Sequence, residues 1–275
     1  MANDKPQLHA SMMDTLSRCG EQFRRRYGKL FGHNDREEII PPSGVLITGI
    51  ATHKTIEENL KHMIEEGRPL STEYLADFAH DAASALWNGE VRLDPDDGED
   101  IKTARGDSID TAVNLSVLHA EELAPKLSPK AVERKWVINL SGFPYDLAGT
   151  IDIEEHGGVI RDTKTAKRKP NQDAADDSQQ LTMYSLAKKV CDGTEPTALY
   201  LDNLVKTKQP QLVVLKTQRT DADRAMLLRR IERATKIIEA GAFQPALPTD
   251  WICSEKWCGY WSTCPFASRK KQFSV

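Results

Sequence analysis

The sequence lacks the features that mark membrane, secreted and disulfide-built proteins. It contains no run of eighteen apolar residues, so we expect no membrane span. Its first residues, MANDKPQLHASMMD, carry no basic and then apolar signal, and we expect the protein to stay in the cytosol or its equivalent. The five cysteines are an odd number, which argues against a disulfide framework and fits a reducing compartment.

The chain also has no excess of basic residues, no internal repeat and no low-complexity tract. Its formal net charge of −4 is not the footprint of a tight, non-specific nucleic-acid binder. An enzyme that holds DNA transiently in a cleft needs only local basic patches, although each short run is also typical of a solvated face. The local runs are Arg24–Arg26, Lys164 with Lys167–Lys169, and Lys206 with Lys208.

What is present is enough apolar sequence, 39% of 275 residues, to bury a core within one domain over 1–275. Period-3.6 patterns predict helices, and alternating or β-branched runs predict strands. The helices are expected at 8–31, 49–66, 72–88, 107–123, 174–191 and 220–240. The strands are expected at 131–140, 145–154, 158–165, 196–205 and 211–217, the first three as a meander.

This order of elements predicts an α/β fold with a mixed central sheet flanked by helices. Residues 70–125 are interpreted as a helical insertion, and 126–206 as the catalytic core of strands and a helix. Residues 242–275 are rich in Trp, Cys and Pro, show no periodic pattern, and form a Cys-rich tail.

Two carboxylates and a lysine are expected to meet on one face of the meander. If His156-Gly157-Gly158 is a three-residue turn, Asp152 lies directly opposite Asp162. Side chains alternate along a strand, so Lys164 shares the face of Asp162. A slip of one residue would separate these groups, and the inference therefore depends on the turn.

Such a pair of carboxylates is costly unless a cation neutralises it. Hard oxygen ligands select Mg²⁺ or Mn²⁺, which can polarise a phosphodiester and assist its hydrolysis. Lys164 can then position the attacking hydroxide or offset charge on the phosphate. The alternative is two surface aspartates beside a solvated lysine.

Four motifs, in order, resemble the RecB-type nucleases of the PD-(D/E)xK superfamily. They are Gly49-Ile-Ala-Thr-His53, Gly149-Thr-Ile-Asp152, Ile160-Arg-Asp162-Thr-Lys164 and Gln180-Leu-Thr-Met-Tyr184. The resemblance implies a restriction-endonuclease-like core that binds DNA. It implies metal ligation by His53, Asp152, Asp162 and the Thr163 carbonyl, with Glu133 at a further acidic position. It also implies catalysis by Lys164, with Gln180 and Tyr184 facing the site and the DNA strand.

A second metal centre is expected at four cysteines. Cys253, Cys258 and Cys264 follow a C-x4-C-x5-C pattern, and Cys19 lies far away in sequence. Soft thiolates in a reducing compartment suggest a metal or cluster, and zinc would more usually show two close pairs of ligands. The set resembles the iron–sulfur subgroup with AddB-like and CRISPR-associated exonucleases, which implies a [4Fe–4S] cluster; its commoner spacing is C-x2-C. Zn²⁺ and four buried thiols are the alternatives.

The resemblance implies a Mg²⁺- or Mn²⁺-dependent DNA exonuclease acting on ends or single strands. The expected setting is recombination, repair or viral DNA processing in the cytoplasm of a bacterial, archaeal or virus-infected cell. The chain is expected to work either alone or with a recombination, helicase or CRISPR-type protein as its partner. Two alternatives stay open: a DNA-binding or assembly module without catalysis, and an RNA-, site- or structure-specific endonuclease on the same core.

Overall fold

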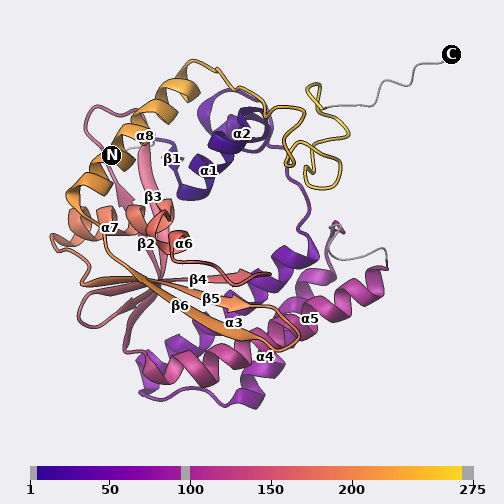
Figure 1. Ribbon diagram of the computed structural model, residues 1–275, viewed down its shortest axis with the longest axis vertical. Helices are drawn as coiled ribbons and strands as arrows, with labels where there is room; N and C mark the ends of the chain where they lie inside the picture. Colours follow the sequence, from indigo (N-terminus) through magenta and orange to yellow (C-terminus); the bar gives the residue numbers. More distant parts are fainter. Residues whose placement is uncertain (1–4, 94–99, 268–275) are drawn as a thin grey trace.

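The computed structural model describes residues 5–93 and 100–267. A mixed sheet lies at the centre, with helices on both sides, which confirms the expected fold class (Figure 1). Two parts of the expected appendages lie outside the described residues: the acidic link 94–99 in the helical insertion and the last part of the tail, 268–275.

The sheet has six strands, and its central pairs follow the predicted meander. The strands are β1 (Gln7–Leu8), β2 (Pro129–Ile138), β3 (Asp146–Glu155), β4 (Val159–Ala166), β5 (Ala198–Val205) and β6 (Gln211–Thr217). Their order is β1-β3-β4-β5-β6, with β2 also paired to β3. The β2–β3, β3–β4 and β5–β6 pairs are antiparallel, whereas β1–β3 and β4–β5 are parallel.

The β3–β4 hairpin has the predicted register. Its turn spans residues 156–158, where Gly157 and Gly158 have φ of +79° and +83°, a conformation that favours glycine. Ile153 pairs with Arg161, and Glu154 pairs with Ile160. Beyond these two pairs the ladder stops and the strands separate. The next residues in this register are Asp152 and Asp162, which therefore begin the split.

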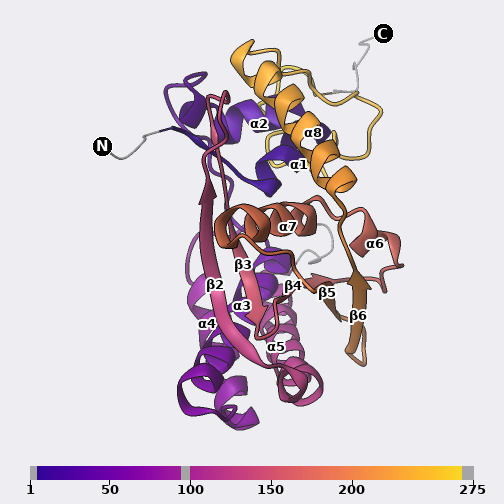
Figure 2. The ribbon, with the colours of Figure 1, turned by 90° about the vertical axis from the view of Figure 1, so that its left-hand side faces the viewer.

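Three helices cover one side of the sheet: α3 (Gly44–Glu66), α4 (Thr72–Trp87) and α5 (Ile101–Leu118). Figure 2 shows them as one group beside the lower ends of β2 and β3. Ile56 and Leu60 of α3 pack with Ile153 of β3 and Leu204 of β5, which seats α3 against the sheet. A π-helical turn (His119–Leu123) and a 3-10 turn (Ala124–Lys126) follow α5 and lead into β2.

The other side of the sheet carries α7 (Gln179–Asp192), with α1 (Ala10–Arg18), α2 (Gly20–Tyr27) and α8 (Asp221–Glu239) beyond it (Figures 1 and 2). The main core lies here, and includes Phe23, Leu147, Leu181 and Ile231. Thr220 caps α8 as expected, and its side chain forms a capping box with Asp223. No helix in the described part of the chain is long and apolar enough to cross a membrane.

Two predicted helices are interrupted. The expected helix 8–31 breaks at Cys19, whose backbone is extended, and ends in a 3-10 turn (Gly28–Phe31). Gly20 causes the break by lying against the tail: its N–H donates to the Gln244 carbonyl at 2.7 Å. The expected helix 174–191 is split into α6 (Asp173–Asp176) and α7, because the Ser178 side chain caps α7 at the Leu181 N–H.

Candidate active site

The split between β3 and β4 brings polar groups from both strands together. The Thr163 N–H of β4 donates to Asp152 Oδ2 of β3 at 2.9 Å, in place of a ladder bond between backbones. The Asp162 side chain is fully buried next to it. At the split, the Asp152 side chain rather than a backbone carbonyl therefore accepts the hydrogen bond of the Thr163 N–H.

Lys164 and α7 form a connected network with the carboxylates. Lys164 Nζ lies 2.8 Å from Asp162 Oδ2 and donates to Gln180 Oε1 at 3.1 Å. Gln180 Nε2 donates to the Tyr184 hydroxyl at 2.6 Å, and that hydroxyl donates to Asp162 Oδ1 at 3.3 Å. Gln180 and Tyr184 are one turn apart on α7, so the helix presents both to the same spot.

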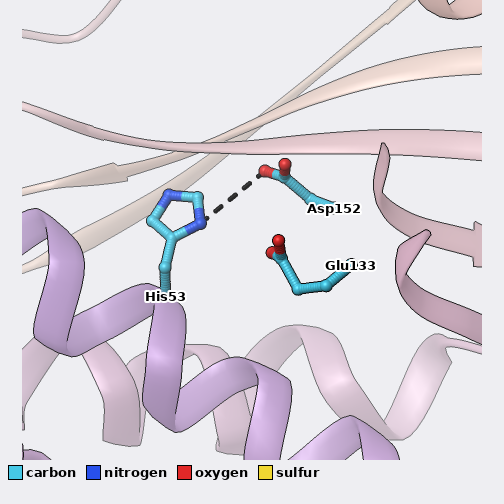
Figure 3. Close-up of side chains that lie close together, drawn as sticks. All are labelled: His53, Glu133 and Asp152. Carbon is cyan, nitrogen blue, oxygen red and sulfur yellow. Dashed lines mark ion pairs between the residues drawn. The ribbon is translucent and has the colours of Figure 1, made fainter. Parts of the chain in front are cut away.

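A second group approaches Asp152 from α3 and β2. His53 Nδ1 lies 3.7 Å from Asp152 Oδ2, and one ligand atom each from His53, Glu133 and Asp152 lie within 4.8 Å of one another. Figure 3 shows the three side chains pointing toward a common point. Glu133 falls opposite Asp152 in the β2–β3 register and has φ of +49°, which is unusual for a residue with a side chain.

The predicted site residues therefore fall into two adjoining sets. Three of the predicted ligands, His53, Glu133 and Asp152, form the cluster that could hold an ion. Asp162 lies beside it and is paired with Lys164. The Thr163 N–H donates a hydrogen bond to Asp152, which places the Thr163 backbone at the split between β3 and β4. The roles of all these residues stay predictions.

Burial and mutual repulsion make the carboxyl groups of this site hard to ionise. Burial raises the pKa of Asp162 to about 6, against the lowering effect of the Lys164 ammonium, and the Asp152 carboxylate adds to the rise. Burial also raises the pKa of Glu133 to about 7, helped by Asp152 and Glu57. A divalent cation would offset both costs, so the donor set fits Mg²⁺ or Mn²⁺.

His53 is suited to act as a neutral ligand. Burial lowers its pKa, and the nearby Lys164 ammonium lowers it further, more than Asp162 and the Thr163 backbone raise it. The imidazole is consequently unprotonated at neutral pH and has a lone pair to offer.

The four predicted cluster cysteines meet at a separate place, between α2 and the tail. Cys19, Cys253, Cys258 and Cys264 all line one cavity. Burial raises the pKa of the Cys258 thiol, and the nearby Cys19, Cys253 and Cys264 add to the rise. The Ala246 N–H donates to Cys19 Sγ at 3.4 Å. The broken helix at Cys19 is what turns this thiol toward the tail.

The spacing of these thiols bears on which group would fit. Four sulfurs around one zinc, with bonds of about 2.3 Å, stand roughly 3.8 Å apart. Among the described residues, no three of the four sulfurs come within 4.8 Å of one another. Four soft thiols around one cavity are donors that fit either a zinc ion or an iron–sulfur cluster.

Arg25 is a structural residue that sequence reasoning placed in a basic patch. Its guanidinium pairs with Glu21 at 3.0 Å and Glu38 at 3.1 Å, and donates to the Thr263 carbonyl at 2.9 Å. It also lies over the Tyr260 ring. Arg25 is buried and ties α2 to the tail beside the cysteines. Glu21 and Arg25 are four residues apart on a helix, and this spacing is the sequence feature that predicts their ion pair.

Comparison with known proteins places this geometry in a family. The family model of the PD-(D/E)XK nuclease superfamily matches residues 7–265. A candidate exonuclease of Eubacterium rectale has a similar structure, with a TM-score of 0.54 at 13% identity, covering 98% of this chain and 91% of that one. The structure of SSO0001 aligns with a TM-score of 0.39 at 12% identity, over 90% of this chain and 100% of that one. No curated protein matches the sequence.

Because the Eubacterium rectale protein is 13% identical to this chain, the similarity shows a shared fold and nothing more. The family model carries the assignment, since it spans the split strands, the α7 network and the cysteine-lined tail. The chain belongs to the PD-(D/E)XK nuclease superfamily.

Proposed function

We propose that this nuclease is a Mg²⁺- or Mn²⁺-dependent DNA exonuclease that acts on ends or single strands. The observation that carries the proposal is the ligand cluster of His53, Glu133 and Asp152 beside the Asp162–Lys164 pair. The proposed setting is recombination, repair or viral DNA processing in a bacterial, archaeal or virus-infected cell. The Eubacterium rectale protein, which shares the fold, is described as a candidate exonuclease.

In this proposal, His53, Glu133, Asp152 and Asp162 hold the cation, and the Thr163 carbonyl adds a further oxygen. When bound, the cation would polarise the scissile phosphate and offset the charge that develops on its oxygens. The Thr163 N–H keeps Asp152 Oδ2 in place at 2.9 Å. The Asp152 carboxylate is therefore pre-oriented for its role.

Lys164 acts as a fixed positive charge. Burial lowers its pKa, but the Asp162 and Asp152 carboxylates raise it by more, and the net pKa is above the ordinary value. The ammonium consequently keeps its proton at neutral pH and can orient the attacking hydroxide or stabilise phosphate charge. Gln180 and Asp162 hold it from two sides.

Tyr184 acts as a hydrogen-bond donor that orients the carboxylates. Burial raises the pKa of its hydroxyl well above the ordinary value, and the Asp162 and Asp152 charges add to the rise. A protonated hydroxyl can donate to Asp162 while it accepts from Gln180. Gln180 thereby links Tyr184 to Lys164 and keeps the network in one arrangement.

We further propose that Cys19, Cys253, Cys258 and Cys264 hold a [4Fe–4S] cluster, with Zn²⁺ as the alternative. The cavity that all four cysteines line supports a shared metal group, and the sequence pattern of one remote and three clustered cysteines favours iron–sulfur over zinc. The role would be structural, because the group would join α2 to the tail. Visible absorption together with iron and sulfide analysis of the purified protein distinguishes the two.

The proposed architecture is a single nuclease domain over 1–275. Residues 70–125 are its helical insertion, 126–206 its catalytic core, and 242–275 a tail joined to Cys19 through the cysteine site. Its substrate is DNA, and its protein partner would be a recombination, helicase or CRISPR-type factor. Leu115 of α5 lies in one core cluster with Ile153 of β3 and Leu204 of β5, which supports a role for the insertion in covering one face of the sheet.

The test compares the protein with its Lys164→Ala variant on linear and covalently closed circular DNA, in Mg²⁺ or Mn²⁺. We expect degradation of linear DNA only, and at least a hundredfold loss in the variant, because a charge positioned for the transition state is removed (about 3 kcal/mol). Lys135→Ala, an exposed lysine on β2, is the control. Cleavage of circles would make the protein an endonuclease, and no cleavage by folded protein would favour a binding module.

A further inference from the structure

A cavity of about 240 Å³ borders the candidate active site on the side of α1 and α7. Three residues of the site, Asp152, Gln180 and Tyr184, form part of its lining. The remaining described lining comes from β2, β3, α7 and the start of α1. Because Asp152 is a predicted ligand of the cation, a group attached to a phosphate held there can reach this cavity.

Part of the lining is apolar and closely packed. Trp136 of β2 and Met183 of α7 line the cavity, and both are buried. Gly149 pairs with Trp136 across β2 and β3, and a Cβ added to this glycine would lie 2.6 Å from Trp136 Cζ2. The absence of a side chain at Gly149 therefore lets the indole lie directly against β3. Trp136 and Met183 thus give the cavity a fixed apolar wall, against which a flat apolar group can pack.

Three polar groups in the same lining can still form hydrogen bonds. Within residues 5–93 and 100–267, the hydroxyls of Ser11 and Thr150 have no hydrogen-bond partner. The third group is the imidazole of His9, the residue that precedes α1. Burial lowers the pKa of His9 by more than the Ala148 backbone raises it. The ring is therefore neutral at physiological pH, with one nitrogen as a donor and the other as an acceptor.

The chemistry of this lining fits an uncharged group with flat faces and a polar edge. Among the described residues that form it there is no lysine or arginine, so a phosphate would find no cationic side chain there. A nucleobase carries no charge, and its apolar faces match the wall of Trp136 and Met183. The donors and acceptors at its edge match the three polar groups. The lining consequently favours a base over a phosphate.

We propose that this cavity binds the base of the nucleotide next to the scissile phosphate. A single sugar joins a base to its phosphate, so a phosphate held at Asp152 has its base within reach of a cavity that Asp152 itself lines. The base packs against the apolar wall and forms hydrogen bonds with His9, Ser11 or Thr150. The inference rests on the proposed function for the identity of the substrate, DNA.

The test measures binding without cleavage, with Lys164→Ala as the background protein and Mg²⁺ present. Single-stranded oligonucleotides that lack one base, at each position in turn, are titrated against it. We expect affinity to fall roughly tenfold at one position, because the missing base loses its contacts with the cavity. That position should be the one next to the bond that the unsubstituted protein cleaves. No position-specific loss would overturn the proposal.

Two variants in the same background assign the loss to this cavity. Ser11→Phe is designed to fill it, and His9→Ala/Thr150→Ala removes two of its polar groups. Both should bind the intact oligonucleotide more weakly and should lose less affinity when the base is missing. Ser17→Phe, at an equally exposed serine of α1 outside this cavity, should keep the full tenfold effect. A loss that persists unchanged in both cavity variants would contradict the proposal.

Cleavage of the intact oligonucleotide by the unsubstituted protein separates this proposal from the proposed function. Cleavage, together with no position-specific loss in the binding assay, refutes the base-binding cavity and leaves the nuclease assignment intact. Absence of cleavage, together with a loss that the cavity variants reduce, refutes the exonuclease and supports the cavity as a DNA-binding site. Failure of the folded protein to bind any of the oligonucleotides would refute both.

Discussion

Burial tunes single residues of this protein away from their ordinary chemistry, and His119 is a clear case outside the candidate site. Its side chain is 1% exposed, and its Nε2 has no hydrogen-bond partner within the described ranges. Burial lowers the pKa of His119 to about 3, and the nearby His53 and Arg161 lower it further. The His119 imidazole is therefore neutral in the folded protein at every physiological pH.

This residue predicts a pH dependence of stability. The unfolded chain protonates His119 near pH 6.5, whereas the folded chain resists until about pH 3. Below pH 6.5 the unfolded chain gains a proton at His119 that the folded chain does not. The free energy of unfolding therefore falls by about 1.4 kcal/mol per pH unit between pH 6.5 and the folded pKa of about 3. Urea unfolding of the protein and His119→Leu at pH 7 and pH 5 should show a smaller drop in the variant. The exposed His80→Gln is the control, and parallel profiles for all three would refute the prediction.

At the scale of elements, the conformation of the backbone decides what a glycine contributes. Gly106 lies within α5, with no atom near an added Cβ, and Gly157 lies in the β3–β4 turn with φ of +79° and equally open surroundings. The two sites differ in backbone conformation rather than in available space. A methyl group should consequently have opposite effects at the two positions.

Gly106→Ala should stabilise the protein by roughly 0.5–1 kcal/mol, because alanine loses less backbone entropy in a helix. Gly157→Ala should destabilise it by about 1–2 kcal/mol, since a left-handed conformation is costly for a residue with a Cβ. Chemical denaturation of the two variants measures both changes. Changes of the same sign would show that the turn adopts a different conformation from the one described here.

At the scale of the whole molecule, two distant parts of the chain meet at the tail. Arg25 binds the Thr263 carbonyl, and Gly20 binds the Gln244 carbonyl, so α2 and the tail are joined through ordinary protein contacts. The four cysteines line the cavity in the same region. A metal group held there would add its binding free energy to folding.

Cys19→Ala should therefore release the proposed group and loosen the tail. We expect loss of bound metal, a lower midpoint of thermal unfolding by several degrees (roughly 2–4 °C per kcal/mol), and faster proteolysis within 242–267. Cys191→Ala, at an exposed cysteine away from that cavity, is the matched control. Retention of metal and of protease resistance in Cys19→Ala would rule out the four-cysteine site.

Much of the fold and part of the candidate site could be predicted from local sequence. Alternation along 145–154 and 158–165, with two glycines between them, predicts the register that brings Asp152 and Asp162 to one place. Lys164 follows from alternation, and Gln180 with Tyr184 follows from the helical period. These relations depend on short stretches of backbone, whose geometry is nearly the same in every protein.

Only the tertiary structure decided the relations between distant segments. The broken helix at Cys19 follows from the close approach of Gly20 to Gln244, which no local propensity contains. The left-handed backbone of Glu133, and the cavity that joins α1 to Asp152 and Tyr184, likewise depend on packing. Sequence alone determined which elements form and which of their faces carry the chemistry, because periodicity is local. Packing determined which faces meet, because burial is a property of the whole chain.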